Sequence, residues 1–431
     1  MLAEVIVRRK NKRMDLVTNL KELLRPLETK RRELQATKWL KKQHALSYTH
    51  PIPRIAFIAG EPETWDKSEP VFEAFSKRED CELFLYVCPS YDSVLNVPEE
   101  YGYEWEYFSR KYPSFCKSIY KEDGSLIDLN SEELDYIFYG DPYMGHFAHL
   151  YRCYHLVQSN AKLCYIPYGF YGAKFGYDLM ANNTDFFKNM YFTFADCNDV
   201  AEILNGLLKD VSHPEYRHIM QLGYPTLEKF LKDDSYHTCN YHEVLWTPRW
   251  SYSDLGGGSH FLEYKDQILG IPERYNNFHL TLRPHPMLFA HIVQSGKMTQ
   301  KEADDYKQRI NDAGAALDQH GDVNATIKNT DIFVTDYSSL IINFFMTGKP
   351  IIYCPLDDGY GKTYTKMLEG IYIANNYDEV DHYLEMLHKG NDPLKNKREE
   401  ILKSPEFSVY RDSTENIVSC ILDDFNAHVK H

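Results

Sequence analysis

Two successive series of short apolar segments, each followed by a loop, constrain the fold of this chain more than any other feature. Helical patterns lie between several of the segments, and this alternation is typical of a mostly parallel sheet covered by helices. The first series comprises Arg54–Ala59, Glu82–Cys88, Tyr136–Tyr139, Lys162–Ile166 and Tyr191–Phe194. The second comprises Val244–Thr247, Phe278–Leu282, Ile332–Thr335 and Pro350–Cys354.

The length of the chain favours two domains, because 431 residues exceed what one hydrophobic core usually organises. We predict an N-terminal Rossmann-like domain over residues 51–225 and a C-terminal Rossmann-like domain over residues 226–431, with the boundary near Gly223-Tyr-Pro225. We expect residues 1–50 to form a basic amphipathic helical extension. The last helix, around Ser413–His428, can close either domain.

The composition indicates a folded protein of the cytoplasm. Its 34 Tyr and 23 Phe suit large cores, and its net charge of −15 argues against nonspecific binding to nucleic acid. The nine cysteines include no Cys-x-x-Cys pair and no Cys/His cluster at zinc spacing, so we expect reduced thiols. No apolar run approaches the ~18 residues of a membrane-spanning helix, and the first residues lack a signal-peptide pattern. We expect a soluble protein or one that is peripheral on the inner face of the cell membrane.

Positive charge is concentrated at the start of the chain, where residues 1–48 hold 13 Lys or Arg against 5 Asp or Glu. Leucines between Leu16 and Leu27 recur at helical spacing, and Pro26 starts or kinks a second helix that runs through Leu34 to Leu40. Such a basic amphipathic segment can lie on an anionic membrane surface. It can equally pack on the protein body with a solvated basic face, and the sequence leaves both interpretations open.

The clearest functional motif is Thr335-Asp336-Tyr337-Ser338-Ser339, which lies between an apolar strand and a helical run that ends at Gly348. Ser338 is placed to cap that helix, and free backbone N–H groups beside two hydroxyls favour phosphate oxygens. We expect Asp336, Ser338 and Ser339 to bind a diphosphate. Taken alone, the motif is more often an ordinary helix cap without a ligand, since Ser and Asp are common at caps.

A second motif, Leu282-Arg283-Pro284-His285-Pro286, directly follows a predicted strand. Two prolines fix the backbone around His285, and the guanidinium of Arg283 offers a planar fork that suits a diphosphate. Ligands of open α/β sheets bind at the carboxyl ends of strands, where this loop lies. We expect Arg283 to bind the diphosphate with His285 presented beside it, and a turn with surface charges is the alternative.

A third motif follows the first strand of the second domain and consists of Trp246-Thr-Pro-Arg-Trp250 and Gly256-Gly-Gly-Ser-His260. Glycines let a backbone approach phosphate closely, while Arg249, Ser259 and His260 can supply donors. Neither the Gly-x-x-x-x-Gly-Lys-Ser/Thr pattern nor a complete Gly-x-Gly-x-x-Gly pattern occurs. The motif predicts a nucleotide site, and a flexible loop without function is the alternative.

The three motifs together are far more specific than any one of them. Their combination resembles the carboxyl-terminal half of the CDP-glycerol glycerophosphotransferase family, whose members share a Thr-Pro loop, an (Arg/Lys)-Pro-His-Pro loop and an Asp-Tyr-Ser-Ser helix start. In the family Gly-Lys-Pro follows, and here it is Gly348-Lys-Pro350. The resemblance is strong from Trp246 to Cys354 and weaker over Arg54–Pro225, and residues 1–48 carry none of it.

This resemblance implies the two-domain GT-B architecture, with the donor nucleotide in the second domain and the acceptor entering the cleft from the first. It maps the family's diphosphate-binding serines onto Ser338 and Ser339. It also maps the family's Pro-His-Pro histidine onto His285, which implies that His285 is catalytic. Family members work without a tightly bound catalytic metal, so we expect a CDP-activated donor substrate, no tightly bound cofactor and no metal site. Positive side chains and the helix dipole would stabilise the departing CMP.

The first domain departs from the family pattern at one position. Where family polymerases carry a Trp-His-Gly-type motif, whose His is the expected base, this chain has Tyr165-Ile-Pro-Tyr168-Gly-Phe170. A tyrosine hydroxyl is a poor base at neutral pH, so we expect Tyr168 to position the acceptor hydroxyl by hydrogen bonding. A lone histidine is more often structural than catalytic. The nearby Asp141, His146, His149 and His155 are therefore weaker candidates for the base.

The sequence therefore predicts a transferase that moves glycerol phosphate, or a related polyol phosphate, from a CDP-activated donor to a hydroxyl. The acceptor is a glycan or a lipid-linked molecule in teichoic-acid, capsule or surface-polysaccharide synthesis. A GT-B glycosyltransferase that uses a nucleotide sugar is the second hypothesis. A catalytically degenerate protein that binds CDP is the third.

Overall fold

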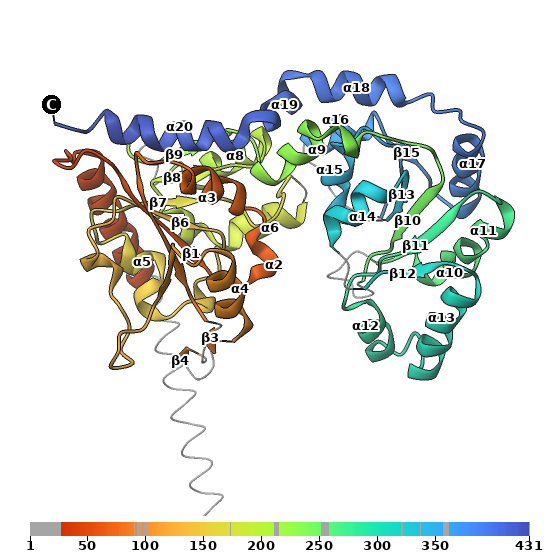
Figure 1. The fold of residues 1–431 in the computed structure, drawn as a ribbon, viewed down its shortest axis with the longest axis horizontal. Helices are drawn as coiled ribbons and strands as arrows, with labels where there is room; N and C mark the ends of the chain where they lie inside the picture. Colours follow the sequence, from red (N-terminus) through yellow and green to blue (C-terminus); the bar gives the residue numbers. More distant parts are fainter. Residues whose placement is uncertain are drawn as a thin grey trace, which may run out of the picture.

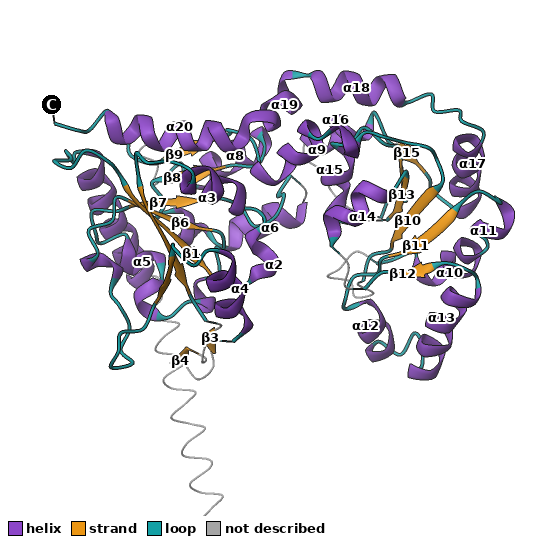
Figure 2. Cartoon of the chain, in the orientation of Figure 1, coloured by secondary structure: helices purple, strands orange, loops and turns teal. Residues whose placement is uncertain are grey.

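The chain folds into two α/β lobes, each built around its own parallel sheet (Figure 1). This computed structural model describes residues 27–89, 91–92, 97–98, 102–172, 174–210, 215–250, 258–319, 322–336, 338–356 and 362–430. Figure 2 shows the strands at the centre of each lobe and the helices around them. The predicted α/β class with two Rossmann-like sheets is confirmed.

The described strands of the first sheet all run parallel, in the order β5-β2-β1-β6-β7-β8-β9. From β1 the chain runs outward to β2 and β5, and it then returns to the other side of β1 with β6. This gives the sheet a topological switch point between β1 and β6, where open α/β sheets usually bind ligands. The strands are β1 (Arg54–Ala59), β2 (Glu82–Val87), β5 (Cys116–Ser118), β6 (Tyr136–Tyr139), β7 (Lys162–Tyr165), β8 (Phe192–Phe194) and β9 (His218–Met220).

Helices cover both faces of this sheet, so its central strands are largely apolar rather than alternately polar. Every residue of β6 and of β7 is buried. The helices are α2 (Pro62–Trp65), α3 (Glu69–Ser76), α4 (Tyr103–Lys111), α5 (Cys153–Leu156), α6 (Lys174–Asn182), α7 (Thr184–Phe187) and α8 (Asn198–Leu207). Three 3₁₀ turns, η1 (Leu129–Ser131), η2 (Met144–His146) and η3 (His149–Tyr151), and the small hairpin of β3 (Tyr91–Asp92) with β4 (Val97–Pro98) complete the lobe.

The second sheet repeats this plan, with described parallel strands in the order β12-β11-β10-β13-β14-β15. Its switch point lies between β10 and β13. The strands are β10 (Glu243–Thr247), β11 (His279–Leu282), β12 (Ala316–Leu317), β13 (Ile332–Thr335), β14 (Ile351–Tyr353) and β15 (Tyr372–Ile373). Each of the nine strands predicted from apolar segments is present, with bounds that differ by at most one residue at an end.

The helices of the second lobe alternate with these strands, as the sequence predicts. They are α9 (Glu228–Lys232), α10 (Phe261–Leu269), α11 (Ile271–Arg274), α12 (Leu288–Gln294), α13 (Gln300–Asp312), α14 (Val323–Asn329), α15 (Leu340–Phe345), α16 (Lys362–Leu368), α17 (Tyr377–His388), α18 (Lys395–Lys403) and α19 (Pro405–Ser408). The turns η4 (Pro225–Leu227), η5 (Asp234–Tyr236) and η6 (Val409–Asp412) join them.

The connection between the lobes passes through Gly223, whose φ is +101°. A Cβ atom at this position would lie 2.1 Å from Oγ of Ser413 and 2.8 Å from the carbonyl oxygen of Val409. Only glycine satisfies both the backbone conformation and this close approach. The crossing therefore lies next to the predicted boundary at residues 223–225.

The last helix, α20 (Ser413–Asn426), returns to the first lobe (Figure 1). Ile417, Val418, Ile421 and Phe425 are buried in the core of that lobe. A buried ion pair reinforces the contact, since Nζ of Lys162 lies 2.5 Å from Oδ2 of Asp424. Packing thus groups α20 with the first lobe, which is one of the two domains that the sequence allows it to close.

Residues 27–44 form a helix that packs on the first lobe. Ala36, Leu40 and Gln43 are fully buried, and Nε2 of Gln43 donates to the carbonyl oxygens of Val157, Ser159 and Ala161. The predicted second helix of the extension is thus present, and it packs on the body with most of its basic side chains exposed. The first predicted helix, from Leu16, lies outside the described residues.

Candidate active site

The motifs of the second lobe come together at one edge of its sheet. Strands β11, β10 and β13 are neighbours, so their carboxyl ends carry the second, third and first motifs side by side. Oγ1 of Thr335 donates to the carbonyl oxygen of Thr247 at 2.8 Å, which ties the ends of β13 and β10 together. The motifs therefore flank the switch point between β10 and β13.

Asp336, which is buried, connects two of the motifs. Its carboxylate accepts hydrogen bonds from the backbone N–H groups of Arg249 (2.5 Å) and His260 (3.0 Å) and from Oγ of Ser259 (3.3 Å). These contacts engage both carboxylate oxygens with protein donors. Asp336 therefore organises the loops around the site, and direct contact of its carboxylate with a diphosphate stays a prediction.

His285 lies at the end of β11 with its ring stacked on Trp250, at 5.5 Å between ring centroids. The backbone N–H of Met287 donates to Nδ1 of His285 at 3.2 Å, which places the proton of the neutral ring on Nε2. Burial lowers the pKa of His285, so the ring is mainly neutral near pH 7. His285 therefore presents an Nε2–H donor at the predicted nucleotide site.

The structure engages Arg283 with other protein groups. Its Nη1 lies 2.5 Å from Oδ2 of Asp318 and 3.1 Å from Oγ1 of Thr326. This ion pair connects the loop after β11 with the segment after β12 and with α14. Arg283 thus holds the His285 loop in place, and its predicted contact with a diphosphate stays untested.

Ser338 and Ser339 precede α15 as predicted. Oγ of Ser338 accepts the backbone N–H of Leu340 at 3.2 Å, while Ser339 is exposed and makes no side-chain cap bond. Both hydroxyl protons can therefore be offered to an anion. Tyr337 lies outside the described residues, as do Gly256 and Gly257 of the third motif.

His260 and Lys349 both make hydrogen bonds that hold neighbouring segments of the second lobe together. Nε2 of His260 lies 3.3 Å from the carbonyl oxygen of Pro355, and Nδ1 lies 3.1 Å from Oε2 of Glu263, so this ring fastens the start of α10. Lys349 of the Gly-Lys-Pro sequence is buried, and its Nζ donates to the carbonyl oxygens of Lys328 and Thr330 at the end of α14. A lysine here satisfies the last carbonyls of a helix.

Tyr168 lies on the first lobe, in the loop after β7. Its hydroxyl is 2.8 Å from the hydroxyl of Tyr143, and burial followed by this hydrogen bond raises its pKa. A raised pKa makes Tyr168 even less suited to act as a base. The predicted positioning role remains compatible with the observed contact.

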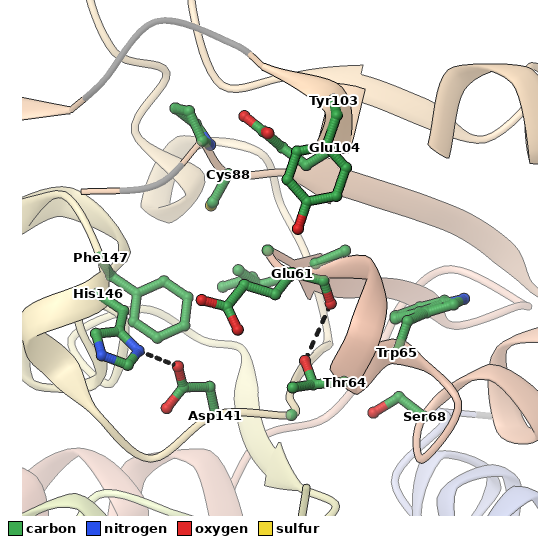
Figure 3. Close-up of a pocket in the computed structure, with 15 residues that line it drawn as sticks. Glu61, Thr64, Trp65, Ser68, Cys88, Tyr103, Glu104, Asp141, His146 and Phe147 are labelled. Carbon is green, nitrogen blue, oxygen red and sulfur yellow. Dashed lines mark hydrogen bonds and ion pairs between the residues drawn. The ribbon is translucent and has the colours of Figure 1, made fainter. Parts of the chain in front are cut away.

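A pocket that the sequence did not predict lies at the switch point of the first sheet (Figure 3). Residues that directly follow β1, β2 and β6 line it, and its volume is about 160 Å³. His146 and Asp141 form an ion pair at its rim, with 2.6 Å between Nδ1 and Oδ2. The available signal was Gly140-Asp141 directly after a strand, the same placement that identified the motifs of the second lobe.

Metal clusters, membrane-spanning helices and disulfides are all absent from the part of the chain that the structure describes. Within the described ranges, no group of three or more His, Cys, Asp or Glu side chains is arranged to hold a metal ion. No helix among the described residues is both long enough and apolar enough to cross a bilayer. All nine cysteines are unpaired.

Two facing, doubly wound lobes with a candidate site at each switch point define a fold of the GT-B type. Residues 207–421 match the model of the CDP-Glycerol:Poly(glycerophosphate) glycerophosphotransferase family. The chain belongs to this family, as its three motifs predicted. No curated protein matches the sequence significantly.

Solved structures with the same fold include a UDP complex, a UDP-GlcNAc 2-epimerase and a wall teichoic acid polymerase. MnaA from S. aureus, solved with UDP, is 16% identical, with a TM-score of 0.55 over 87% of this chain and 97% of that one. UDP-GlcNAc 2-epimerase from Neisseria meningitidis, bound to UDP-GlcNAc, is 12% identical, with a TM-score of 0.56 over 86% and 100%. A variant of the wall teichoic acid polymerase TagF is 12% identical, with a TM-score of 0.51 over 97% and 98%. These likenesses concern the fold.

Proposed function

We propose that the enzyme transfers glycerol phosphate, or a related polyol phosphate, from a CDP-activated donor to a hydroxyl group. The acceptor is a glycan or a lipid-linked molecule in the synthesis of teichoic acid, capsule or another surface polysaccharide. One observation carries this proposal: three family motifs, far apart in sequence, meet at the switch point between β10 and β13. The likeness in fold to the wall teichoic acid polymerase TagF, of which one structure was soaked with CDPG, supports the choice of donor.

In the proposed reaction the acceptor oxygen attacks the β-phosphorus of the donor, and CMP leaves. The diphosphate would lie beside the end of β11 and the start of α15. Nε2–H of His285 and the hydroxyls of Ser338 and Ser339 would donate to its oxygens and stabilise charge that grows on the leaving CMP. Because His285 is held in one tautomer by Met287, its donor is oriented before the substrate binds.

The proposed reaction needs no tightly bound metal or cofactor. Support comes from the donors available at the site, which are a neutral imidazole, two hydroxyls and the first N–H groups of α15. Wild-type enzyme should therefore retain its turnover after exhaustive treatment with EDTA. A loss that Mg²⁺ restores would remove this part of the proposal.

The proposal also includes attachment to an anionic membrane surface on the cytoplasmic side. Leu27 and Leu34 are 69% and 62% exposed on the helix over residues 27–44, and Lys30, Lys38 and Lys41 recur beside them at helical spacing. Changing the three lysines to glutamate should abolish binding to vesicles that contain phosphatidylglycerol. Binding by the wild type should fall as salt is raised.

The decisive experiment measures release of CMP from CDP-glycerol and CDP-ribitol, and of UDP from UDP-GlcNAc, in the presence of a saccharide acceptor. We expect turnover with a CDP-polyol and none with UDP-GlcNAc. Turnover with the UDP-sugar alone would favour a nucleotide-sugar glycosyltransferase. Tight binding of CDP without turnover of any donor would favour a degenerate CDP-binding protein.

A further inference from the structure

The pocket at the switch point of the first sheet carries an inference about the acceptor, and it rests on the proposed transferase function. We propose that Asp141 and His146 form the general-base pair for the acceptor hydroxyl. We further propose that the pocket beside them binds an uncharged, polyhydroxylated end of the acceptor, such as a saccharide.

The pair has the geometry of an oriented base. Asp141 directly follows Gly140 at the end of β6, and its Oδ2 lies 2.6 Å from Nδ1 of His146. Its other oxygen accepts the backbone N–H of Tyr143 at 2.6 Å, which fixes the carboxylate. The carboxylate therefore holds a proton on Nδ1 and leaves the lone pair of Nε2 as the basic atom.

The position of the pair suits an acceptor that meets a donor on the other lobe. The side chain of His146 is 57% exposed, which places it at the rim of the pocket. Figure 1 shows α2, which follows β1, on the side of the first lobe that faces the second, and α15 on the facing side of the second lobe. The edges that carry the two candidate sites thus face each other.

The pocket lining indicates the class of acceptor. Glu61, Thr64 and Ser68 offer polar groups, while Trp65 and Phe147 contribute aromatic surface (Figure 3). Figure 3 shows the Glu61 carboxylate pointing toward the side of the pocket that holds Asp141, His146 and Phe147. Carboxylates and hydroxyls beside aromatic rings suit the hydroxyls and C–H faces of a sugar.

Charge argues against a phosphate in this pocket. Its described lining includes the carboxyl side chains of Glu61, Glu104 and Asp141, and no Lys or Arg is among those residues. A phosphate would gain no cation there and would be repelled by the carboxylates. Any phosphate on the acceptor must therefore lie outside the pocket.

The pair also accounts for the departure at Tyr168. The Tyr168 hydroxyl bonds to that of Tyr143, whose ring centroid lies 5.3 Å from the ring centroid of His146. Tyr168 thus contacts His146 indirectly, through Tyr143, and it supports the segment that carries the base. The base has moved from the loop after β7 to the loop after β6.

The proposed step transfers one proton to His146 and one glycerophosphoryl group to the acceptor. Nε2 of His146 takes the proton from the acceptor hydroxyl while the acceptor oxygen forms a bond to the β-phosphorus. The bond between that phosphorus and the oxygen of CMP breaks, and CMP leaves with the electron pair. His146 then releases its proton to solvent, so that the ring is neutral for the next turnover.

The pH dependence of the reaction follows from the same geometry. The hydrogen bond to Asp141, opposed by burial and aided by the charges of Asp141 and Glu61, raises the pKa of His146 above its ordinary value. A base must be neutral, so kcat should rise with pH through this raised pKa. Asp141→Asn removes the largest cause of the shift and should move the rise to lower pH.

The experiment uses the full chain with CDP-glycerol and an uncharged alkyl glycoside. His146→Asn should lower kcat by roughly 10²- to 10⁴-fold, the usual contribution of a general base. The Kd for CDP-glycerol, measured by calorimetry, should stay within about twofold because the donor site lies on the other lobe. His155→Asn is the matched control, because His155 pairs with Asp128 at 2.9 Å on the same lobe and is not among the lining residues.

An unchanged kcat in His146→Asn would overturn the assignment. Should that variant not fold, the pH profile of Asp141→Asn decides, and an unshifted rise would overturn the pair as the base. A wild type that releases no CMP from CDP-glycerol would instead refute the proposed function, and that result is seen before any variant of the first lobe is made.

The acceptor class is tested with two matched alkyl glycosides, one uncharged and one with a phosphate on its terminal sugar. Wild type should prefer the uncharged acceptor in kcat/KM, and Glu61→Lys should reduce that preference by roughly tenfold. Equal use of both acceptors by wild type would overturn the proposed charge selectivity.

Discussion

The buried carboxylate of Asp336 accepts a hydrogen bond from the backbone N–H of His260 at 3.0 Å. Asp336 follows β13 and His260 precedes α10, so one side chain fixes both sides of the switch point. Removal of the carboxylate leaves two backbone N–H groups without their acceptor, at a cost of ~1–3 kcal/mol each. We therefore expect Asp336→Ala to lower the unfolding temperature and to weaken CDP binding together. Asp304→Ala, at an exposed position on α13, should change neither quantity.

Loss of His285 should affect chemistry much more than stability. One side of the ring stacks on Trp250 while the residue stays largely open to solvent, so His285→Ala should cost only about 1 kcal/mol of unfolding free energy. It should abolish CMP release, because it removes the oriented Nε2–H donor. The Ser338→Ala/Ser339→Ala double variant should behave similarly. The control is His279→Ala, because the side chain of His279 is 72% exposed and lies at the amino-terminal end of β11. Wild-type turnover in His285→Ala would contradict the assignment.

Tyr168→Phe should have an intermediate effect. The change removes one hydrogen bond between neutral hydroxyls, which is worth ~1 kcal/mol, and it leaves the ring in place. Turnover should fall by roughly tenfold or less, since 1.4 kcal/mol corresponds to tenfold. Steady-state kinetics at saturating donor and acceptor measure this. A loss as complete as that of His285→Ala would make Tyr168 a participant in the chemistry.

Asp196 should make folding sensitive to pH. This fully buried side chain follows β8 and accepts the backbone N–H of Tyr171, while its Oδ1 has no hydrogen-bond partner among the described residues. Burial raises its pKa to about 7. The folded protein therefore keeps a proton that the unfolded chain releases above pH ~4, so this group lowers stability as the pH rises from ~4 to ~7.

The Asp196→Asn variant removes that titration. Its free energy of unfolding, relative to wild type, should increase across this pH window and level off above pH ~7. Urea unfolding at several pH values measures the difference. A difference that does not change with pH would show that Asp196 is ionised in the folded state at all these values.

Gln43 should anchor the helix over residues 27–44. Its Nε2 donates to three carbonyl oxygens of the first lobe, at 2.8 to 3.1 Å. Gln43→Ala should lower the free energy of unfolding by ~1–3 kcal/mol, and a chain that begins at residue 51 should lose more because Leu40 and Tyr48 leave the core as well. Gln35→Ala on the same helix is the control. A stable truncated chain would contradict this anchoring role.

Much of the fold could be predicted from the sequence because parallel strands buried on both faces are continuous apolar segments. Segments such as Tyr136–Tyr139 and Ile332–Thr335 therefore stand out without any knowledge of their partners. The return of α20 to the first lobe could not be predicted. Its apolar face fits either sheet, and the choice depends on contacts such as Lys162 with Asp424, which are 262 residues apart.

The positions of candidate site residues could be predicted where a distinctive motif directly follows an apolar strand. His285, Ser338 and Ser339 meet this condition, and their chemical roles stay predictions. The partner of Arg283 could not be predicted, since Asp318 has no local pattern that marks it as an ion-pair partner. His146 was ranked low as a lone histidine, and only the folded chain shows that it pairs with the Asp at the end of β6.

The most direct test of the account is phosphorus NMR of the wild-type enzyme with CDP-glycerol and an uncharged saccharide acceptor. We expect CMP and a phosphodiester between glycerol and the acceptor to appear in equal amounts. Products that contain no such phosphodiester, or CDP-glycerol that remains intact, would contradict the proposed transfer.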